Sequence, residues 1–354
     1  LDIFISFYFR GSFLIIKINL EVWILNYILL VIGFILLVKG ADYFVDGSSS
    51  IAKKLRIPSL IIGLTIVAFG TSAPEAAVSI TASVNGQNGM AIGNVIGSNI
   101  FNLLMVIGAS GIIKPLLVEK SILSKEFPFV LLTSIILVIL SLDSLLFNSS
   151  INIISRMDGI ILLILFAVFL YYLINSAMKN RKENLCDPET SVDIDVGNVK
   201  AIEKNNTMIK SILISIIGIA AIIFGGNLVV NSASDIASSF GVSDQLIGLT
   251  IVSIGTSLPE FVTSVIAATK GESDLALGNV IGSNIFNILF VIGASALISP
   301  MTVDPKLIID GAIMILSTVL VYFYAYRKND ISKFESITLS LLYFGYMGYL
   351  VFTA

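Results

Sequence analysis

The sequence predicts an all-α integral membrane protein of ten transmembrane helices, arranged as two inverted-topology repeats of five helices each. Three observations predict this fold class. Of the 354 residues, 56% are hydrophobic and only 13% are charged, which is roughly half the charged fraction of a typical soluble protein. Apolar runs of about 20 residues recur along the whole chain, as expected of helices that cross a bilayer. A stretch of 40 residues returns 185 positions later without a gap.

Ten apolar segments are long enough to be transmembrane helices. Only helices and closed barrels satisfy backbone hydrogen bonds in lipid, and the alternating pattern of barrel strands is missing. The predicted helices cover residues 24–45, 58–84, 89–111, 127–146, 154–177, 209–232, 243–268, 274–298, 307–326 and 335–353. A polar linker, 179–208, divides them into five and five. Because five is odd, the second repeat (209–354) must enter the membrane upside down relative to the first repeat (23–178).

Residues 1–22 precede the first repeat and have an uncertain status. They are apolar, but Arg10 and Lys17 interrupt them. Arginine is costly near the centre of a bilayer, so we do not expect a stable transmembrane helix here. The first methionine is Met90. We therefore interpret Leu1 as a non-standard start or as part of an over-extended gene model, with a weak signal segment as the alternative.

Lysine and arginine are distributed unequally between the two sets of loops. Alternate loops, beginning with the loop at residues 53–56, carry sixteen of them, whereas the opposite loops carry only Arg156 and Lys306. The excess of positive charge on the cytoplasmic side of membrane proteins therefore predicts a multi-pass protein of the cytoplasmic membrane. The central linker lies inside the cell and both ends of the ten-helix unit lie outside. The acidic residues of the linker indicate a solvated segment, with a regulatory calcium site as the alternative.

The composition excludes several classes of protein. A single cysteine, Cys186, excludes a disulfide framework within the chain. There is no histidine, so Ser-His triads, HExxH zinc sites and histidine proton relays are excluded. The serines have no base partner and there is no GxGD motif, which argues against an intramembrane enzyme. We predict no enzyme activity, no cofactor, no nucleic-acid binding and no obligate protein partner; the expected surroundings are the lipid bilayer.

The duplicated stretch contains residues that are unusual in apolar helices. Its copies, residues 63–102 and 248–287, are identical at 24 of 40 positions and share the motifs GTSxPE and GNVIGSNIFN. In the first motif, Pro74 removes a helical hydrogen bond and clashes with the carbonyl of Gly70. We therefore expect the helix to break or unwind between these two residues. Carbonyl oxygens freed near Thr71 must then find partners or line a cavity.

Three kinds of oxygen atom gather at each predicted break: freed carbonyls, hydroxyls and a carboxylate. Hard cations such as Ca²⁺ and Na⁺ bind such oxygens. No lysine or arginine lies near these positions in either spanning helix, so a proline kink with an ion-paired glutamate is the weaker interpretation. The side chains concerned are Thr71, Ser72 and Glu75 in the first copy and Thr256, Ser257 and Glu260 in the second.

The second motif places a polar stripe on the third predicted helix. Asn94, Ser98 and Asn102 lie at positions i, i+4 and i+8 of one helical face, while Gly93 and Gly97 allow close approach of a neighbouring helix. The counterparts in the eighth helix are Asn279, Ser283, Asn287, Gly278 and Gly282. We expect the two serines and the last asparagine of each stripe to contact ions or their water. For Asn94 and Asn279 the sequence leaves open whether they do so or only join helices by hydrogen bonds.

Two inverted copies that meet at a pseudo-two-fold axis would bring Glu75 and Glu260 together near the midplane of the membrane. Two carboxylates at close range repel each other unless a cation lies between them, and one Ca²⁺ would neutralise the pair. An ion channel is the alternative class, but a duplicated, proline-broken site at the midplane is more typical of a transporter.

At these residues the chain resembles the sodium/calcium exchangers of the cation/calcium antiporter superfamily. The paired motifs GTSAPE…GNVIGSNIFN and GTSLPE…GNVIGSNIFN are similar to the two alpha repeats of that family, and the resemblance extends over all ten predicted helices. It implies a secondary antiporter that exchanges several Na⁺ for one Ca²⁺ by alternating access. Both ions would be substrates, and the unequal charges make electrogenic exchange the expectation.

The resemblance also implies which atoms bind the ions. For Ca²⁺ it implies the carboxylates of Glu75 and Glu260 together with the carbonyls of Thr71 and Thr256. For Na⁺ it implies the same glutamates with the side chains of Ser72, Ser257, Ser98 and Ser283 and the carbonyls of Ala68 and Ser253.

Two departures from relatives narrow the choice of exchanged ion. Proton/calcium exchangers carry an extra glutamate where this chain has Gly97 and Gly282, so exchange of H⁺ or another cation for Ca²⁺ is the alternative function. Potassium-dependent relatives, and some prokaryotic sodium/calcium exchangers, carry aspartate at the position of Asn287. The asparagine argues against potassium cotransport here.

The first predicted helix raises two further expectations. Lys39, Asp42 and Asp46 lie late in this helix, where charged side chains usually reach for the membrane interface. The resemblance implies that the first and sixth helices slide past the others to switch access.

Overall fold

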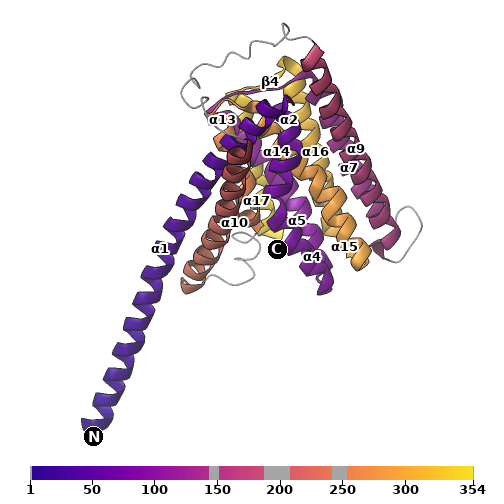
Figure 1. Ribbon diagram of the computed structural model, residues 1–354. Coiled ribbons are helices and arrows are strands. Elements are labelled where there is room, and N and C mark those ends of the chain that lie inside the picture. Colours follow the sequence, from indigo (N-terminus) through magenta and orange to yellow (C-terminus); the bar gives the residue numbers. More distant parts are fainter. Residues whose placement is uncertain (1, 143–150, 187–207, 241–252, 354) are drawn as a thin grey trace.

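The computed structural model describes residues 2–142, 151–186, 208–240 and 253–353. In these parts the chain is a bundle of long helices, with four strands of two or three residues (Figure 1). Among the described residues, seven helices are long and apolar enough to cross a membrane, and a pair of helices bent at a break adds an eighth. The protein is therefore an all-α, multi-pass membrane protein.

The elements of the first half form a series of helices in which π-helical segments, labelled η, continue directly into α-helix. They are α1 (Asp2–Leu55), α2 (Ser59–Ile62), η1 (Gly63–Val67), α3 (Ala68–Thr71), α4 (Ala73–Val84), α5 (Asn88–Phe101), η2 (Asn102–Val106), α6 (Ile107–Ile113), β1 (Leu116–Leu117), η3 (Ile122–Glu126), α7 (Phe127–Leu140), β2 (Asn152–Ile154) and α9 (Arg156–Cys186).

The second half follows the same order. Its elements are α10 (Met208–Ser239), α12 (Ser253–Thr256), α13 (Leu258–Thr269), α14 (Ser273–Ile285), η5 (Phe286–Ile292), α15 (Gly293–Ile298), β3 (Met301–Val303), α16 (Pro305–Lys328), β4 (Asp330–Ile331) and α17 (Lys333–Thr353). Helices α12 and α13 begin and end 185 residues after α3 and α4, so the sequence repeat is also a repeat of secondary structure.

Several predicted boundaries differ from the structure, including the ends of α7 at Leu140 and of α10 at Ser239, which were predicted at residues 146 and 232. Helix α1 runs without a break through residue 22, and residues 2–55 contain no proline to break it. Helix α9 continues to Cys186, beyond the predicted start of the linker at residue 179. The fourth predicted helix starts earlier, at Ile122. The linker residues 187–207 and the first part of the seventh predicted helix lie outside the described residues.

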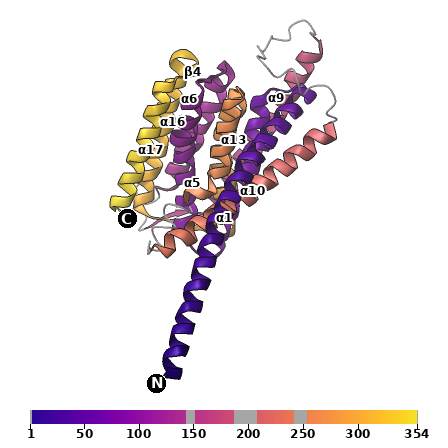
Figure 2. The ribbon, with the colours of Figure 1, turned by 90° about the vertical axis from the view of Figure 1, so that its left-hand side faces the viewer.

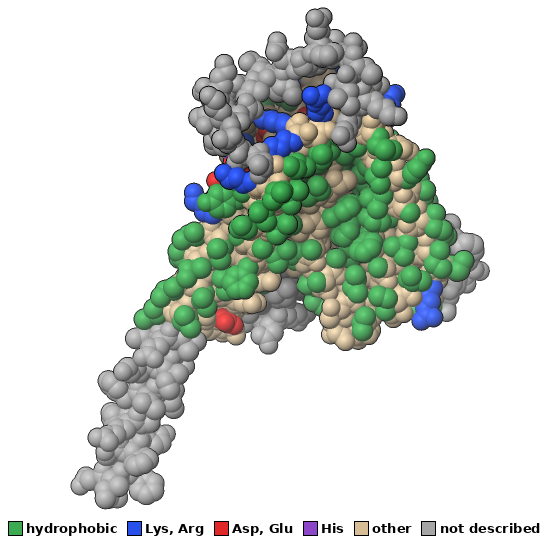
Figure 3. All heavy atoms as spheres, in the orientation of Figure 1, with side chains coloured by type: hydrophobic (Ala, Val, Ile, Leu, Met, Phe, Trp, Pro, Cys, Tyr) green, Lys and Arg blue, Asp and Glu red, His purple; other side chains and the backbone are tan. Residues whose placement is uncertain are grey.

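Two helical segments form the centre of the bundle. In the spans Asn88–Ile113 and Ser273–Ile298, 72% and 78% of the most apolar window is buried, against 22–44% in the other five long spans. The outer spans therefore present apolar side chains to their surroundings, and hydrophobic side chains cover the middle of the face in Figure 3. The segments that carry the GNVIGSNIFN motifs are thus enclosed by the rest of the protein.

Two short antiparallel ribbons connect the halves. Strand β1 pairs with β4, and β2 pairs with β3, so each ribbon takes one strand from each half. Helix α16 leads from β3 to β4 and has 24 residues, a length of about 36 Å at 1.5 Å per residue. The two ribbons therefore lie at opposite ends of the bundle.

Basic side chains gather at one of these ends. The β1–β4 ribbon holds together the lysine-rich loops near Lys114 and Arg327, whereas the β2–β3 ribbon joins the loops that contain Arg156 and Lys306. In Figure 3 most of the visible lysine and arginine side chains lie at the end that carries β4 in Figure 1. The loops near Lys114 and Arg327, grouped by their charge in the sequence, therefore share one end of the structure.

Helices α1 and α10 pack side by side along one flank of the bundle (Figures 1 and 2). Their backbones approach closely at glycines: a Cβ atom on Gly40 would lie 2.9 Å from the carbonyl oxygen of Gly218, and one on Gly225 would lie 2.8 Å from that of Gly33. A small residue at each crossing point lets two helices pack this tightly.

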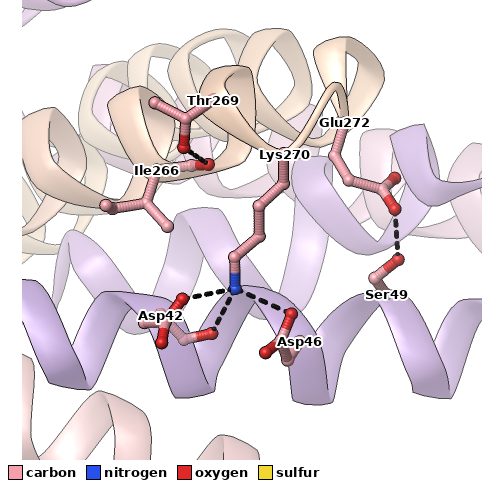
Figure 4. Close-up of polar contacts among 7 residues, drawn as sticks. All are labelled: Asp42, Asp46, Ser49, Ile266, Thr269, Lys270 and Glu272. Atoms are coloured by element: carbon pink, nitrogen blue, oxygen red, sulfur yellow. Dashed lines mark hydrogen bonds and ion pairs between the residues drawn. The ribbon is translucent and has the colours of Figure 1, made fainter. Parts of the chain in front are cut away.

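Lys270, in the turn between α13 and α14, ties α1 to the central helices (Figure 4). Its Nζ lies 2.7 Å from Oδ1 of Asp42 and 2.7 Å from Oδ1 of Asp46. Next to this pair, Ser49 Oγ donates to Glu272 Oε1 at 2.6 Å. Both aspartates therefore pair with a lysine more than 200 residues away in the chain, an interaction that their place in α1 did not predict.

Candidate functional site

Each GTSxPE motif breaks a helix, as predicted. In the first copy α3 ends at Thr71 and α4 begins at Ala73, and Ser72 between them has φ −82° and ψ 4°. The helical segments on either side are bent by 49°. Pro74, in the first turn of α4, has no N–H to donate to the carbonyl of Gly70. The helix break therefore lies where the sequence predicted it, between Gly70 and Pro74.

The second copy repeats this geometry. Helix α12 ends at Thr256, α13 begins at Leu258, and Ser257 between them has φ −92° and ψ 4°. Ser253 begins α12 as Ala68 begins α3, so the two predicted carbonyl ligands occupy equivalent places. The backbone framework of the candidate site is therefore present twice.

The two breaks bring Glu75 and Glu260 together at the centre of the protein. Both glutamates lie in the first turn of a helix, α4 or α13, and both are completely buried. Their side chains are close enough for their charges to interact. A helix N-terminus favours a negative charge, which makes this position suitable for a carboxylate away from water.

Hydrogen bonds to these carboxylates cross from one half of the chain to the other. Ser72 Oγ donates to Glu260 Oε1 at 2.7 Å, and Ser257 Oγ donates to Glu75 Oε1 at 2.9 Å. The other oxygen of each carboxylate, Oε2, is buried and has no hydrogen-bond partner among the described residues. Each half therefore holds one oxygen of the opposite glutamate and leaves one oxygen of it open.

No basic side chain balances this charge within the described part of the chain. Lys270 pairs with Asp42 and Asp46, and Arg327 pairs with Glu335, so neither contacts Glu75 or Glu260. Within the same described residues, no three acidic, histidine or cysteine side chains gather to hold a metal ion. An ion bound between the two glutamates would therefore complete its shell with neutral oxygens, which Ca²⁺ and Na⁺ accept.

Several of the other predicted side chains offer such oxygens. Ser98 Oγ, Asn102 Oδ1 and Asn287 Oδ1 are buried and lack a partner among the described residues. Ser283 Oγ donates to the carbonyl of Ala68 at a long 3.5 Å. Buried polar atoms usually have hydrogen-bond partners. Because these three oxygens have none among the described residues, Ser98, Asn102 and Asn287 are candidate ligands.

The hydroxyls of the two threonines point to asparagines of the opposite half. Thr71 Oγ1 lies 3.0 Å from Asn279 Oδ1, and Thr256 Oγ1 lies 3.4 Å from Asn94 Oδ1. Both threonine hydroxyls therefore reach across to the other half of the chain.

Two further asparagines, which contact Asn102 and Asn287, were not predicted. Asn99 and Asn284 each donate from Nδ2 to the other's backbone carbonyl at 3.3 Å. They also accept from Asn287 Nδ2 at 3.3 Å and from Asn102 Nδ2 at 3.1 Å, respectively. Their identity in both copies of GNVIGSNIFN was the signal that could have found them, but they lie off the stripe that the helical spacing defined.

Known proteins of one family resemble this chain over most of its length. The family described as "Sodium/calcium exchanger protein" matches residues 25–175 and 210–352. The sodium/calcium exchanger MaX1 of Methanosarcina acetivorans is 33% identical over 342 residues, which cover 91% of this chain and 97% of that protein. The inner membrane protein YrbG of Escherichia coli is 34% identical over 304 residues, which cover 85% and 89%.

Solved structures share the fold. A structure of the sodium-calcium exchanger NCX_Mj soaked with 10 mM Na⁺ and no Ca²⁺ superposes with a TM-score of 0.76 at 33% identity. The superposition covers 92% of this chain and 99% of the other. Further structures of the same exchanger were soaked with Sr²⁺ or Ca²⁺ and superpose equally well, with a TM-score of 0.77.

Proposed function

This chain belongs to the sodium/calcium exchanger family, and we propose that it is a secondary antiporter that exchanges Na⁺ for Ca²⁺ by alternating access. The observation that carries the proposal is the buried pair of Glu75 and Glu260, each with one unpartnered carboxylate oxygen. Two buried like charges without a basic partner are unfavourable, and a cation that binds both removes that penalty.

The proposed ligands are the oxygens around the two helix breaks. Ca²⁺ would lie between the two carboxylates, with the carbonyls of Thr71 and Thr256 beside it. Na⁺ would use the same glutamates together with neutral oxygens. Because the ions compete for shared carboxylate oxygens, both cannot be bound at once, and this competition couples their transport. The neutral oxygens proposed for Na⁺ or for ordered water come from Ser72, Ser257, Ser98, Ser283, Asn102 and Asn287 and from the carbonyls of Ala68 and Ser253.

We also propose that the two halves are inverted repeats of five transmembrane helices each. The matching helix bounds of the halves and the ribbon at each end, with one strand from each half, support this arrangement. The basic loops at the β4 end support a cytoplasmic position for that end and for the linker. The protein would then lie in the cytoplasmic membrane with both ends of the ten-helix unit outside.

Close packing at Gly282 favours Na⁺ over H⁺ as the exchanged ion. Proton/calcium exchangers resemble this chain but carry a glutamate at this position. A Cβ atom on Gly282 would lie 2.7 Å from Cβ of Ala68 and 2.8 Å from both Cα and the carbonyl oxygen of Leu64. A glutamate therefore does not fit here unless the helix that contains Leu64 moves away.

The experiment that tests the proposed function is ⁴⁵Ca²⁺ uptake into proteoliposomes driven by sodium, potassium or proton gradients in turn. An outward sodium gradient is expected to drive uptake, and potassium or proton gradients of equal size are not. Uptake driven equally well by a proton gradient would replace Na⁺ by H⁺ in the proposal. Downhill Ca²⁺ flux that is independent of any counter-gradient would favour a channel.

Exchange is expected to be electrogenic. Two carboxylates and one Ca²⁺ make a neutral site, whereas more than two Na⁺ leave a net positive charge. Moving one net charge through 100 mV changes the free energy by about 2.3 kcal/mol, which shifts the equilibrium Ca²⁺ gradient about 50-fold. An inside-positive potential should therefore speed sodium-driven Ca²⁺ uptake. The measurement is uptake under imposed potassium diffusion potentials, and rates that do not respond to voltage would refute electrogenic exchange.

A further inference from the structure

Asn279 joins the two halves of the site and uses all of its amide hydrogen-bonding groups in doing so. Its Nδ2 donates to Ser264 Oγ at 2.8 Å and to the backbone carbonyl of Glu260 at 3.3 Å, within its own half. Its Oδ1 accepts from Thr71 Oγ1 of the other half at 3.0 Å. The side chain is completely buried, so these three hydrogen bonds are its polar contacts among the described residues.

The orientation of this amide follows from its partners. Only an N–H group can donate to the carbonyl of Glu260, so Nδ2 faces that residue and Oδ1 faces Thr71. Ser264 Oγ in turn donates to the carbonyl of Ala276 at 3.5 Å, which leaves its lone pairs to accept from Asn279. Rotating the amide by half a turn would place an oxygen against a carbonyl oxygen.

Asn94 makes the same three contacts with the halves exchanged. Its Nδ2 donates to Ser79 Oγ at 2.9 Å and reaches the carbonyl of Glu75 at 3.5 Å. Its Oδ1 accepts from Thr256 Oγ1 at 3.4 Å. The arrangement therefore occurs twice, with one asparagine for each glutamate.

Each glutamate is held at two points by the opposite half of the chain. One point is its carboxylate, which a serine binds, and the other is its backbone, which a threonine reaches through an asparagine. Ser72 binds the carboxylate of Glu260 directly, and the preceding residue, Thr71, reaches the backbone of Glu260 through Asn279. Two adjacent residues of one helix break are thus fixed to the carboxylate end and to the backbone end of the opposite glutamate. This fixes the backbone of the break, including the carbonyl of Thr71, relative to the carboxylate.

We propose that Asn94 and Asn279 are positioning residues that set the affinity for Ca²⁺ without binding the ion. Each aligns the threonine carbonyl of one half with the glutamate of the other. The inference rests on the proposed function, since it concerns the same pair of glutamates. It also separates these asparagines from Asn102 and Asn287, whose unpartnered Oδ1 atoms face no competing donor among the described residues.

Ca²⁺ should depend on this alignment more than Na⁺. Calcium binds oxygens at 2.3–2.6 Å, and in the proposed site it uses carbonyls from both breaks at once. The proposed sodium ligands include the serine hydroxyls, which contact the glutamates without the asparagines. A small displacement of one break therefore weakens the calcium site first.

Removing the asparagine amide should not prevent folding. Thr71 Oγ1 has two other acceptors within reach, the carbonyls of Val67 at 3.0 Å and Ala68 at 3.3 Å. The hydroxyl therefore stays satisfied in Asn279→Ala, and the change acts through the position of the break.

The test is a double-mutant cycle of Asn279→Ala and Thr71→Val in the full-length protein, with transport and equilibrium ⁴⁵Ca²⁺ binding measured on the same preparations. Thr71→Val removes the hydroxyl but keeps the carbonyl. We expect Asn279→Ala to raise the KM for Ca²⁺ about tenfold, with kcat and the half-saturating Na⁺ concentration changed less than about twofold. The double variant should resemble Asn279→Ala alone, because both changes break the same link.

The controls distinguish an effect of the asparagines from misfolding of the variant and from a failure of the proposed function. Thr318→Val removes a buried hydroxyl whose one bond among the described residues lies within its own helix, to the carbonyl of Met314 at 2.9 Å. This variant should leave both KM values unchanged. If Asn279→Ala does not fold, Asn94→Ala with Thr256→Val makes the same cycle in the other half. Additive effects, or equal losses for Ca²⁺ and Na⁺, would overturn the inference. A wild-type protein that binds Ca²⁺ but shows no sodium-driven uptake would overturn the proposed function alone, because the binding cycle still reports on the asparagines.

Discussion

Replacing Glu75 or Glu260 with glutamine is expected to reduce sodium-driven Ca²⁺ uptake by at least about a hundredfold. Glutamine keeps the size of the side chain and one acceptor oxygen for the serine of the opposite half. It removes the charge that offsets a divalent cation, and the loss of one partner from a buried ionic interaction costs about 3–5 kcal/mol. Initial rates of ⁴⁵Ca²⁺ uptake into proteoliposomes give the measurement.

Glu126→Gln is the matched control for this prediction. Like Glu75 and Glu260, Glu126 is buried, with one oxygen bound and the other, Oε2, without a partner among the described residues. Tyr172 Oη donates to its Oε1 at 3.1 Å, and it lies at the end of η3, outside the GTSxPE motifs. Its neutral variant should retain uptake within about twofold. Comparable losses in all three variants would mean that any buried glutamate is needed for folding, and that the central pair has no special role.

Replacing Gly63 with valine is expected to destabilise the whole protein. Gly63 lies in η1, where the backbone crosses α14: a Cβ atom there would lie 2.9 Å from the carbonyl oxygen of Leu275 and 3.0 Å from Cα of Gly278. These are backbone atoms that cannot turn aside as a flexible side chain can. We expect a loss of about 3 kcal/mol in stability, at the upper end for overpacked cores. The apparent melting temperature and the monodisperse fraction in detergent give the measurement.

A valine at Gly348 supplies the comparison. Gly348 also lies within a helix, α17, but nothing approaches the place of its Cβ atom within 4 Å. A β-branched residue costs little in a helix by itself, so Gly348→Val should melt near the wild-type temperature. If both variants melted at the same temperature, the close crossing of η1 and α14 would not matter for stability.

The sequence predicted the parts of the fold that depend on local chemistry. The apolar runs located the long helices, and Pro74 located the break at Ser72, because a missing N–H acts on the residue four positions earlier. The fixed offset of the repeat also predicted that the second break would match the first. These features follow from one segment of chain at a time.

Apart from the meeting of Glu75 and Glu260, which the repeat predicted, features that depend on how distant segments meet were not predicted. The crossing of the hydrogen bonds, with Ser72 on Glu260 rather than on Glu75 three residues away, depends on the angle at which the halves pack. The pairing of Lys270 with Asp42 and Asp46 has no counterpart in the repeat, which has Asn227 and Asn231 at the positions equivalent to the aspartates. No spacing rule connects residues more than 200 positions apart.

The asparagines show the same limit within one motif. Helical spacing placed Asn94 and Asn102 on one face. It could not show which of the two amides has partners for all of its hydrogen-bonding groups. The structure separates them, since Asn94 donates to Ser79 and accepts from Thr256, whereas Asn102 keeps a buried Oδ1 without a partner among the described residues. Which atoms are left open is decided by the opposite half of the chain.

The most direct measurement of the shared site is the number of Ca²⁺ ions that bind to each chain at equilibrium. Purified wild-type protein, Glu75→Gln and Glu260→Gln would be titrated with ⁴⁵Ca²⁺ in sodium-free detergent solution. A single pocket built from both glutamates predicts one Ca²⁺ per wild-type chain and none in either variant over the same range of concentration. Two ions per wild-type chain, with one retained by each variant, would mean that the glutamates form separate sites and would contradict the account.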